Sequence, residues 1–380
     1  MADMETAPAV GGDVGSSYVL QDYLRTMVKA GASDLFITVA APPVVKVQGS
    51  FKALTRTALD AQGTRALAYS VLSEAQIQSF EMTLECDMSL DLPNIGRFRV
   101  NVFWQRGAVA LVVRYIRFEI PDLATIGLPP VLGDIAMLKR GLVLVCGPAG
   151  SGKSTTLASM LSHRNSNAQG HILTIEDPIE FVHPHRRSLV NQREVGMDTL
   201  SFHDALRHAM REAPDVIMVG EIRDSQTMQH AMSYADSGHL CMSTLHANSA
   251  NQAIQRVINF FPQDVRHQVL QDLSLNLRAV VGQRLITNVQ GQLVPALEVM
   301  VVTPYIADLI FKGQIDEIKS AMAKGADQGM STFDNSLSSF SSACPCTREM
   351  SIDYDDTKTD VAVRIRLLNG IEAPELDTKY

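Results

Sequence analysis

One stretch of this 380-residue chain, GLVLVCGPAGSGKSTT at 141–156, limits its possible folds more than any other. Its apolar first part is typical of a strand buried in a parallel sheet, and a helix is expected to begin just after the glycine-rich loop. That order of elements is the context in which G-x-x-x-x-G-K-[ST] forms a phosphate-binding loop. Backbone N–H groups of such a loop, with the positive end of the helix, surround phosphate oxygens. The chain is therefore predicted to bind a nucleoside triphosphate through nine loop residues: Gly147, Pro148, Ala149, Gly150, Ser151, Gly152, Lys153, Ser154 and Thr155.

Two side chains of this loop have distinct expected roles. Lys153 can neutralise the β- and γ-phosphates, and the hydroxyl of Ser154 can hold Mg²⁺. Ser154 is the predicted metal ligand.

Composition limits the class of protein and its compartment. Apolar residues make up 46% and charged residues 19% of the chain, as in an ordinary globular protein. A formal charge of −8 argues against a nucleic-acid-binding surface. Five scattered cysteines indicate a reducing cytosol. No segment is apolar and long enough to span a bilayer, and the first residues lack a signal-peptide pattern, so membrane contact is expected only through partners.

The elements expected along the chain fall into two domains. Short strands with one or two helices, including a helical stretch over about 60–82, predict a small α+β domain. Apolar strands at 142–146, 171–176, 216–220 and 239–244 alternate with helices and predict a parallel sheet. Beyond about 263 we expect mostly helix with a short hairpin near 285–300. The predicted organisation is a disordered leader at 1–16, an α+β domain at 17–118, a linker at 119–130, an α/β domain at 131–338 and a tail at 339–380.

Three polar side chains follow strands of the predicted parallel sheet. Glu180 comes shortly after the strand HILTIE, Glu221 directly after VIMVG, and His246 after HLCMST. Because ligands bind at the carboxyl edge of open α/β sheets, these side chains should meet the phosphate loop there. Glu221 suits a general base or a water-positioning group, and His246 can contact the γ-phosphate or the water network. Glu176 and Asp177 lie at the same strand end as Glu180, and one or two of these three carboxylates could instead only cap a turn.

Three arginines of the smaller domain are also candidates. Arg97 and Arg99 share one face of a strand, and Arg114 lies on the next strand. Surface ion pairs are the default interpretation for such residues. However, stabilising the transition state of phosphoryl transfer requires more positive charge than Lys153 supplies, and arginines from a neighbouring domain or subunit would provide it.

Four sequence blocks, GPAGSGKST, TIEDPIEFVH, DVIMVGEIRD and GHLCMSTLHAN, occur in order and at suitable spacing. Together they resemble the Walker A, Asp-box, Walker B and His-box motifs of the secretion ATPases, a superfamily of hexameric RecA-like motors. Segments such as STLHANSANQAIQRVINFFP resemble the type IV pilus retraction ATPases of the PilT/PilU family, and most of all its accessory PilU-like members. The resemblance covers about residues 17–340. The chain contains no CxxC pair, so it lacks the tetracysteine zinc motif of the extension and type II secretion ATPases.

This resemblance implies a fold and a set of site residues. A RecA-like parallel-sheet ATPase domain would follow a PAS-like α+β N-terminal domain and would use ATP with Mg²⁺. Glu180 matches the Asp-box carboxylate, Glu221 the catalytic glutamate of Walker B, and His246 the His-box histidine. The three arginines of the smaller domain match N-domain residues that, in this family, reach toward the nucleotide site of an adjacent packing unit. These arginines are Arg97, Arg99 and Arg114.

The resemblance also implies partners. The chain is expected to form a cytoplasmic homohexamer at the inner-membrane pilus base, where it would retract pili with a PilT-type ATPase and a pilus platform protein. Two alternatives remain open at this point. One is an accessory ring that binds ATP but whose own hydrolysis is dispensable. The other is a nucleic-acid motor, because RecA-like hexamers include helicases, although the acidic composition and the lack of interleaved basic and aromatic residues argue against it.

Overall fold

The computed structural model describes residues 19–47, 49–116, 119–288 and 292–337. The leader expected at 1–16 and the tail expected at 339–380 lie outside these residues. The chain divides into two compact units, with the division between Glu119 and Ile120.

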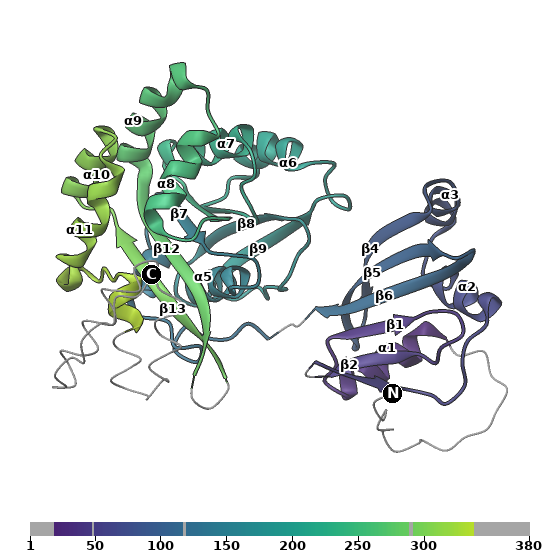
Figure 1. Ribbon diagram of the computed structural model, residues 1–380. Coiled ribbons are helices and arrows are strands. Elements are labelled where there is room, and N and C mark those ends of the chain that lie inside the picture. Colours follow the sequence, from purple (N-terminus) through teal and green to yellow (C-terminus); the bar gives the residue numbers. More distant parts are fainter. Residues whose placement is uncertain (1–18, 48, 117–118, 289–291, 338–380) are drawn as a thin grey trace, which may run out of the picture. The chain divides into compact units, whose positions relative to one another are not determined.

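The first unit is an antiparallel sheet with helices on one face. Its six strands run in the order β3-β2-β1-β6-β5-β4 (Figure 1). Buried side chains of all three helices join those of the strands in one apolar core. The elements are α1 (Leu20–Lys29), β1 (Asp34–Ile37), β2 (Val44–Val47), β3 (Ser50–Ala53), α2 (Ala61–Tyr69), α3 (Glu74–Thr83), β4 (Glu85–Leu92), β5 (Gly96–Gln105) and β6 (Ala108–Ile116).

The helical stretch expected over about 60–82 is two helices rather than one. Ser73 separates them, because it caps α3: its hydroxyl accepts from the backbone N–H of Gln76, and the Gln76 side chain accepts in return from the N–H of Ser73. This reciprocal arrangement satisfies donors that a helix start leaves without partners.

The second unit is built on a seven-stranded sheet in the order β13-β12-β7-β11-β10-β8-β9. All neighbours are parallel except the β12–β13 hairpin. Its elements are α4 (Val131–Ala136), β7 (Gly141–Cys146), α5 (Lys153–Asn167), β8 (Gly170–Glu176), β9 (Ser188–Glu194), α6 (Phe202–Ala209), η1 (Met210–Glu212), β10 (Val216–Val219), α7 (Ser225–Asp236), β11 (Leu240–Leu245), α8 (Ala250–Asn259), η2 (Gln263–Val265), α9 (Arg266–Asn276), β12 (Leu277–Thr287), β13 (Leu293–Val301), α10 (Pro304–Phe311), η3 (Ile315–Glu317), α11 (Ile318–Ala323) and η4 (Ala326–Gln328).

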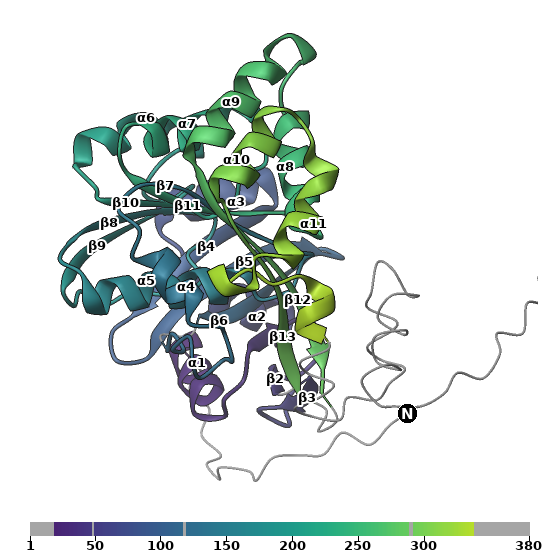
Figure 2. The same ribbon diagram turned by 90° about the vertical axis from the view of Figure 1, so that its left-hand side faces the viewer.

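Helices cover both faces of this sheet (Figures 1 and 2). Alternate residues of β7 point to opposite faces: Leu142 and Leu144 pack with α6–α11, whereas Val143 and Val145 pack with α4 and α5. Strands buried on both faces are apolar throughout, which is why their sequences predicted a parallel sheet. The expected α/β phosphate-loop fold is confirmed.

Two strands of this sheet were not predicted as such. β9 pairs parallel with β8 at the edge of the sheet, and its sequence SLVNQRE is too polar to indicate a buried strand. β12 begins at Leu277, inside the segment expected to be helical, and it pairs with β7 on one side and with β13 on the other. The predicted hairpin near 285–300 is therefore the second half of a longer one.

The segment expected to be a linker, 119–130, contains no helix or strand where it is described, but it is not a free connection. Leu128 is buried, and Leu123 and Ile126 pack on the same core as α4 and α5. The carbonyl of Pro121 also accepts from the hydroxyl of Ser159 in α5 at 2.7 Å. From Ile120 onward these residues belong to the second unit.

Candidate functional site

The phosphate loop connects β7 to α5 at the carboxyl edge of the sheet. Gly150 and Gly152 have φ angles of 75° and 84°, which favour glycine. The Lys153 ammonium turns back onto the loop and donates to the carbonyls of Gly147 and Pro148, at 3.0 and 2.9 Å. Burial lowers the pKa of Lys153, while the nearby carboxylate of Glu221 acts in the opposite direction. The amine is thus held at the place where phosphate would arrive.

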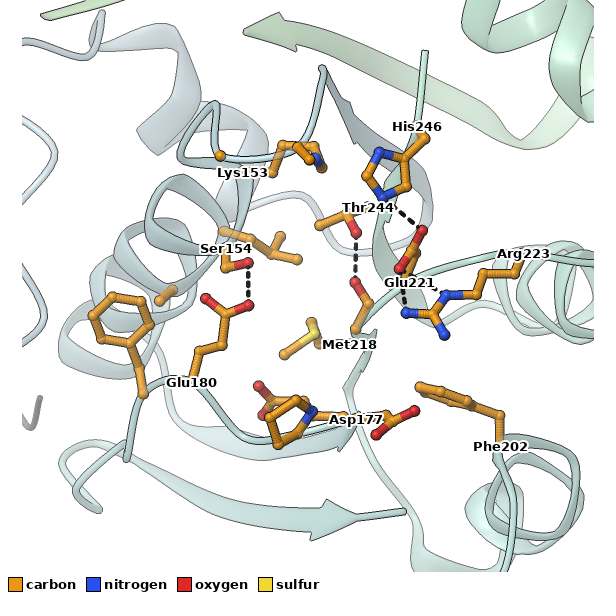
Figure 3. A pocket seen from close by; sticks show the side chains of 18 of the residues that line it. Lys153, Ser154, Asp177, Glu180, Phe202, Met218, Glu221, Arg223, Thr244 and His246 are labelled. Carbon is orange, nitrogen blue, oxygen red and sulfur yellow. Dashed lines mark hydrogen bonds and ion pairs between the residues drawn. The ribbon is translucent and has the colours of Figure 1, made fainter. Parts of the chain in front are cut away.

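The strand order explains why the other site residues meet this loop. β7 pairs with β11, β11 with β10, and β10 with β8, so the carboxyl ends of four parallel strands lie next to one another. The segments that follow them line one pocket together with Lys153 and Ser154 (Figure 3). Among its lining residues are the three predicted from strand ends: Glu180, Glu221 and His246.

Glu180 approaches the loop from the segment after β8. Its carboxylate accepts a hydrogen bond of 2.9 Å from the hydroxyl of Ser154 (Figure 3). This segment turns at Asp177, whose peptide bond to Pro178 is cis. A serine hydroxyl and a carboxylate in contact are oxygen ligands of the kind that Mg²⁺ prefers, and bound phosphates and waters would complete its coordination.

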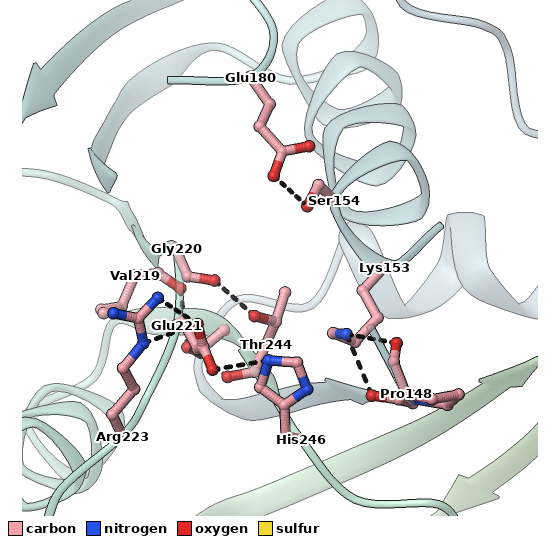
Figure 4. A network of polar contacts seen from close by, with 12 residues as sticks. Pro148, Lys153, Ser154, Glu180, Val219, Gly220, Glu221, Arg223, Thr244 and His246 are labelled. Carbon is pink, nitrogen blue, oxygen red and sulfur yellow. Dashed lines mark hydrogen bonds and ion pairs between the residues drawn. The ribbon is translucent and has the colours of Figure 1, made fainter. Parts of the chain in front are cut away.

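Glu221 stands at the centre of a polar network (Figure 4). One carboxylate oxygen lies 2.9 Å from Nε2 of His246, and the other accepts from Arg223 at 2.8 Å. The hydroxyl of Thr244 fixes the strand end beside it by donating to the carbonyl of Gly220 at 2.6 Å. The carboxylate is therefore held on both sides, and its side chain is only 18% exposed.

A further carboxyl group in the pocket, Glu176, was not among the predicted site residues. It ends β8, is 8% exposed, and accepts from the hydroxyl of Thr174 at 2.7 Å and from the amide of Gln192 at 3.1 Å. Burial raises its pKa to about 7, against the effect of these two hydrogen bonds. Its only sequence signal was its place at the end of the strand HILTIE, inside the TIEDPIEFVH block.

Other lining residues were not predicted as site residues, although Arg223 and His183 lie inside the DVIMVGEIRD and TIEDPIEFVH blocks. Arg223 had the appearance of a surface residue, and Phe202 belongs to α6, which has no motif. His183 also lines the pocket, and burial, with a smaller effect of the nearby Arg186, lowers its pKa to about 4, so its ring is neutral at physiological pH.

The three arginine candidates belong to the first unit, whereas all other predicted site residues belong to the second. Arg97 and Arg99 lie on β5, and Arg99 is directly opposite Arg114 of β6. Each arginine forms an ion pair with an aspartate of its own unit, at N–O distances of 3.3 Å (Arg97–Asp91), 3.7 Å (Arg99–Asp87) and 2.8 Å (Arg114–Asp34).

In 19–47, 49–116, 119–288 and 292–337, no group of three or more His, Cys, Asp or Glu side chains is arranged to hold a metal ion. Over the same part of the chain, no helix has the length and apolar character that crossing a membrane requires.

Comparison with known proteins identifies the family. The family model described as "Type II/IV secretion system protein" matches residues 16–328. The chain is 46% identical to the Type IV pilus ATPase PilU of Pseudomonas aeruginosa over 93% of both chains, and 42% identical to the type IV pilus retraction ATPase PilT of the same organism, over 84% of this chain and 92% of PilT. A crystal structure of the pilus retraction motor PilT with bound ADP superposes with a TM-score of 0.85 at 40% identity, covering 90% of this chain and 98% of that one. The chain therefore belongs to the PilT/PilU family of secretion ATPases and is an ATP-hydrolysing P-loop enzyme.

Proposed function

We propose that this chain is the subunit of a cytoplasmic homohexameric motor that retracts type IV pili at the inner membrane. It would act with a PilT-type retraction ATPase and on a membrane platform protein that holds the pilus base. The observation that carries the proposal is the convergence of Lys153, Ser154, Glu180, Glu221 and His246 in one pocket of a chain that is 46% identical to a PilU and 42% identical to a PilT.

The first step of the proposed mechanism is capture of the phosphates. Lys153 leaves the carbonyls of Gly147 and Pro148 and pairs with the β- and γ-phosphates. Ser154 and Glu180, whose side chains are 2.9 Å apart, are the residues that would hold Mg²⁺, Ser154 through its hydroxyl and Glu180 through its carboxylate. When bound, Mg²⁺ neutralises charge that develops on the phosphate oxygens.

Glu221 then acts on the attacking water. Its carboxylate orients the water toward the γ-phosphorus, while the contact with His246 keeps the carboxylate facing the loop. Arg223 holds the other oxygen, so its ion pair with Glu221 limits rotation of the carboxylate. Because ATP and ADP differ in the γ-phosphate that these residues contact, the two nucleotides favour different conformations, and this difference would drive domain movement in each subunit of the ring.

Arg97, Arg99 and Arg114 would complete the site from an N-terminal unit. Each pairs with an aspartate that it would have to leave in order to reach the phosphates. If one subunit supplies these arginines to the nucleotide site of its neighbour, Arg99→Ala and Glu221→Gln subunits, each inactive alone, should regain part of the hydrolysis rate when they are mixed. The absence of any recovery at every mixing ratio would contradict a role across the subunit boundary.

The test of the whole proposal is ATP hydrolysis by the full-length protein, alone and mixed with its PilT-type partner. Lys153→Ala should abolish nucleotide binding, and Glu221→Gln should retain ATP binding but lose turnover by at least about a hundredfold. The matched control is Glu317→Gln, an exposed glutamate of the same unit that accepts from Gln314 at 3.2 Å and should not change the rate. Light scattering of the same samples should show a hexamer, and a monomer with the full rate would contradict the ring.

Pilus retraction by cells that carry these variants separates the remaining possibilities. A motor requires that Glu221→Gln slows retraction in proportion to the loss of hydrolysis. If Glu221→Gln supports normal retraction together with the PilT-type partner, the chain is an accessory ring rather than a motor. Hydrolysis that rises severalfold on addition of single-stranded DNA would indicate a nucleic-acid motor.

A further inference from the structure

A buried glutamine beneath the phosphate loop lies outside the four motif blocks of the sequence. Gln283 lies on β12, only 3% exposed, and is not among the residues that line the described pocket. In the register of β12 with β7, Gly282 stands opposite Cys146, the last residue of β7. Gln283 is therefore placed just where the chain leaves the sheet to form the loop.

Both ends of the Gln283 amide hold the loop region. Nε2 donates to the carbonyl of Ser151 at 2.8 Å, and Oε1 accepts from the hydroxyl of Thr156 at 2.6 Å. Ser151 precedes Lys153 and Ser154, and Thr156 follows them in the first turn of α5. One side chain thus bridges the two sides of the segment that would contact phosphate.

The backbone of Gln283 is equally close to the loop. A Cβ atom added to Gly147 would lie 2.3 Å from the carbonyl oxygen of Gln283, and one added to Gly152 would lie 2.9 Å from its Nε2. These two glycines are therefore needed for the loop to pass over β12, in addition to any contact they make with nucleotide.

A glycine-rich loop has a large conformational entropy, which binding would have to remove if nothing else fixed the loop. Gln283 can fix the loop independently of the nucleotide, because both of its hydrogen bonds are made to groups of the protein itself. Preorganisation of this kind increases affinity without adding a contact to the ligand.

We propose that Gln283 is a positioning residue for phosphate binding, which holds the loop that carries Lys153 and Ser154 in its binding conformation through Ser151 and Thr156. Because it acts on loop order and not on the reacting atoms, its loss should weaken nucleotide binding and leave turnover at saturation nearly unchanged. A glutamine that only stabilises the fold would instead change unfolding and leave affinity as it was.

The test uses the full-length protein and ADP as the probe. Gln283→Ala should raise the Kd for ADP and the KM for ATP by about tenfold, or about 1.4 kcal/mol, with kcat within about a factor of two of the wild type. Gln283→Glu keeps the acceptor for Thr156 but places a carboxylate against the carbonyl of Ser151, so it should weaken binding at least as much. Hydrogen exchange of the nucleotide-free proteins should show faster exchange in residues 147–154 of both variants.

The matched control is Asn276→Ala. Asn276 is another buried amide of the same unit, 8% exposed, whose side chain donates to Asp236 at 3.4 Å. Asn276 is the last residue of α9, directly before β12, and it lies six residues before Gly282, the residue opposite the end of β7. It is therefore at the edge of the sheet opposite the phosphate loop. Its loss should lower the unfolding temperature without changing the Kd for ADP. Lys153→Ala, which should not bind ADP, shows that the assay depends on the loop.

Thr156→Val alone covers the case in which Gln283→Ala does not fold, and a double-mutant cycle of the two substitutions tests their coupling where both variants fold. Thr156→Val removes only the hydroxyl that donates to Gln283 and should raise the Kd for ADP severalfold, and the two substitutions together should cost less than the sum of their separate effects. The proposal is overturned if Gln283→Ala, or Thr156→Val in its place, lowers the unfolding temperature as Asn276→Ala does and leaves the Kd for ADP and the exchange of residues 147–154 unchanged.

Discussion

Replacing Glu176 with glutamine should change how the stability of the second unit depends on pH. Burial raises the pKa of this carboxyl from 4.5 to about 7 in the folded chain. An acid with a raised folded-state pKa contributes stability below its unfolded pKa and loses that contribution as pH rises through the folded pKa. A shift of this size corresponds to about 3 kcal/mol in total, of which about 2.5 kcal/mol falls between pH 5 and pH 8.

The glutamine of Glu176→Gln has no ionisable side chain, so the variant should not show this loss of stability as the pH rises. The free energy of unfolding of the variant, relative to wild type, should therefore rise by about 2–3 kcal/mol from pH 5 to pH 8. Both proteins are measured without nucleotide by urea unfolding and circular dichroism. The single tryptophan, Trp104, lies in the first unit, so its fluorescence identifies the transition of that unit. The control Glu317→Gln should follow wild type, and parallel pH curves for wild type and Glu176→Gln would refute the assignment of a raised pKa.

Three further substitutions test individual contacts. Glu298→Ala removes the buried acceptor of the Ala250 backbone N–H, at 2.8 Å, and should destabilise the second unit by about 1–3 kcal/mol in urea unfolding, with a smaller effect for Glu298→Gln. Gly147→Ala places a Cβ atom 2.3 Å from the carbonyl oxygen of Gln283, so the loop must move and the Kd for ADP should rise at least tenfold. Ser73→Ala removes the capping box of α3 and should cost the first unit about 1 kcal/mol, read from tryptophan fluorescence during unfolding.

The parts of the fold and site that could be predicted are those with a local signal. The phosphate loop is one contiguous motif, and strands buried on both faces are apolar throughout, so β7, β8, β10 and β11 could be placed within a residue or two. Once these strands were predicted to be parallel, the rule for sheet edges placed Glu180, Glu221 and His246 near the loop. The pocket lined by all three agrees with that geometry, although their catalytic roles stay predictions.

The parts that could not be predicted depend on tertiary contacts. β9 is an edge strand with polar side chains, and only its pairing with β8 makes it a strand. The β12 sequence LRAVVGQRLIT has no period that separates strand from helix, and pairing with β7 decides the outcome. The raised pKa of Glu176 likewise comes from burial by distant segments, which no local pattern encodes.

These two unpredicted strands hold the predicted site. Gln192 of β9 donates to the carbonyl of Phe181 at 2.9 Å and accepts from the N–H of His183 at 2.7 Å, so it fixes the segment that carries Glu180. Gln283 of β12 fixes the phosphate loop on the other side of the pocket. Residues that contact substrate recur as motifs because their chemistry demands particular groups at fixed spacing, whereas a supporting amide can be supplied by any strand that passes beneath. Motif searches will therefore find the reacting groups of such an enzyme and overlook the amides that keep them in place.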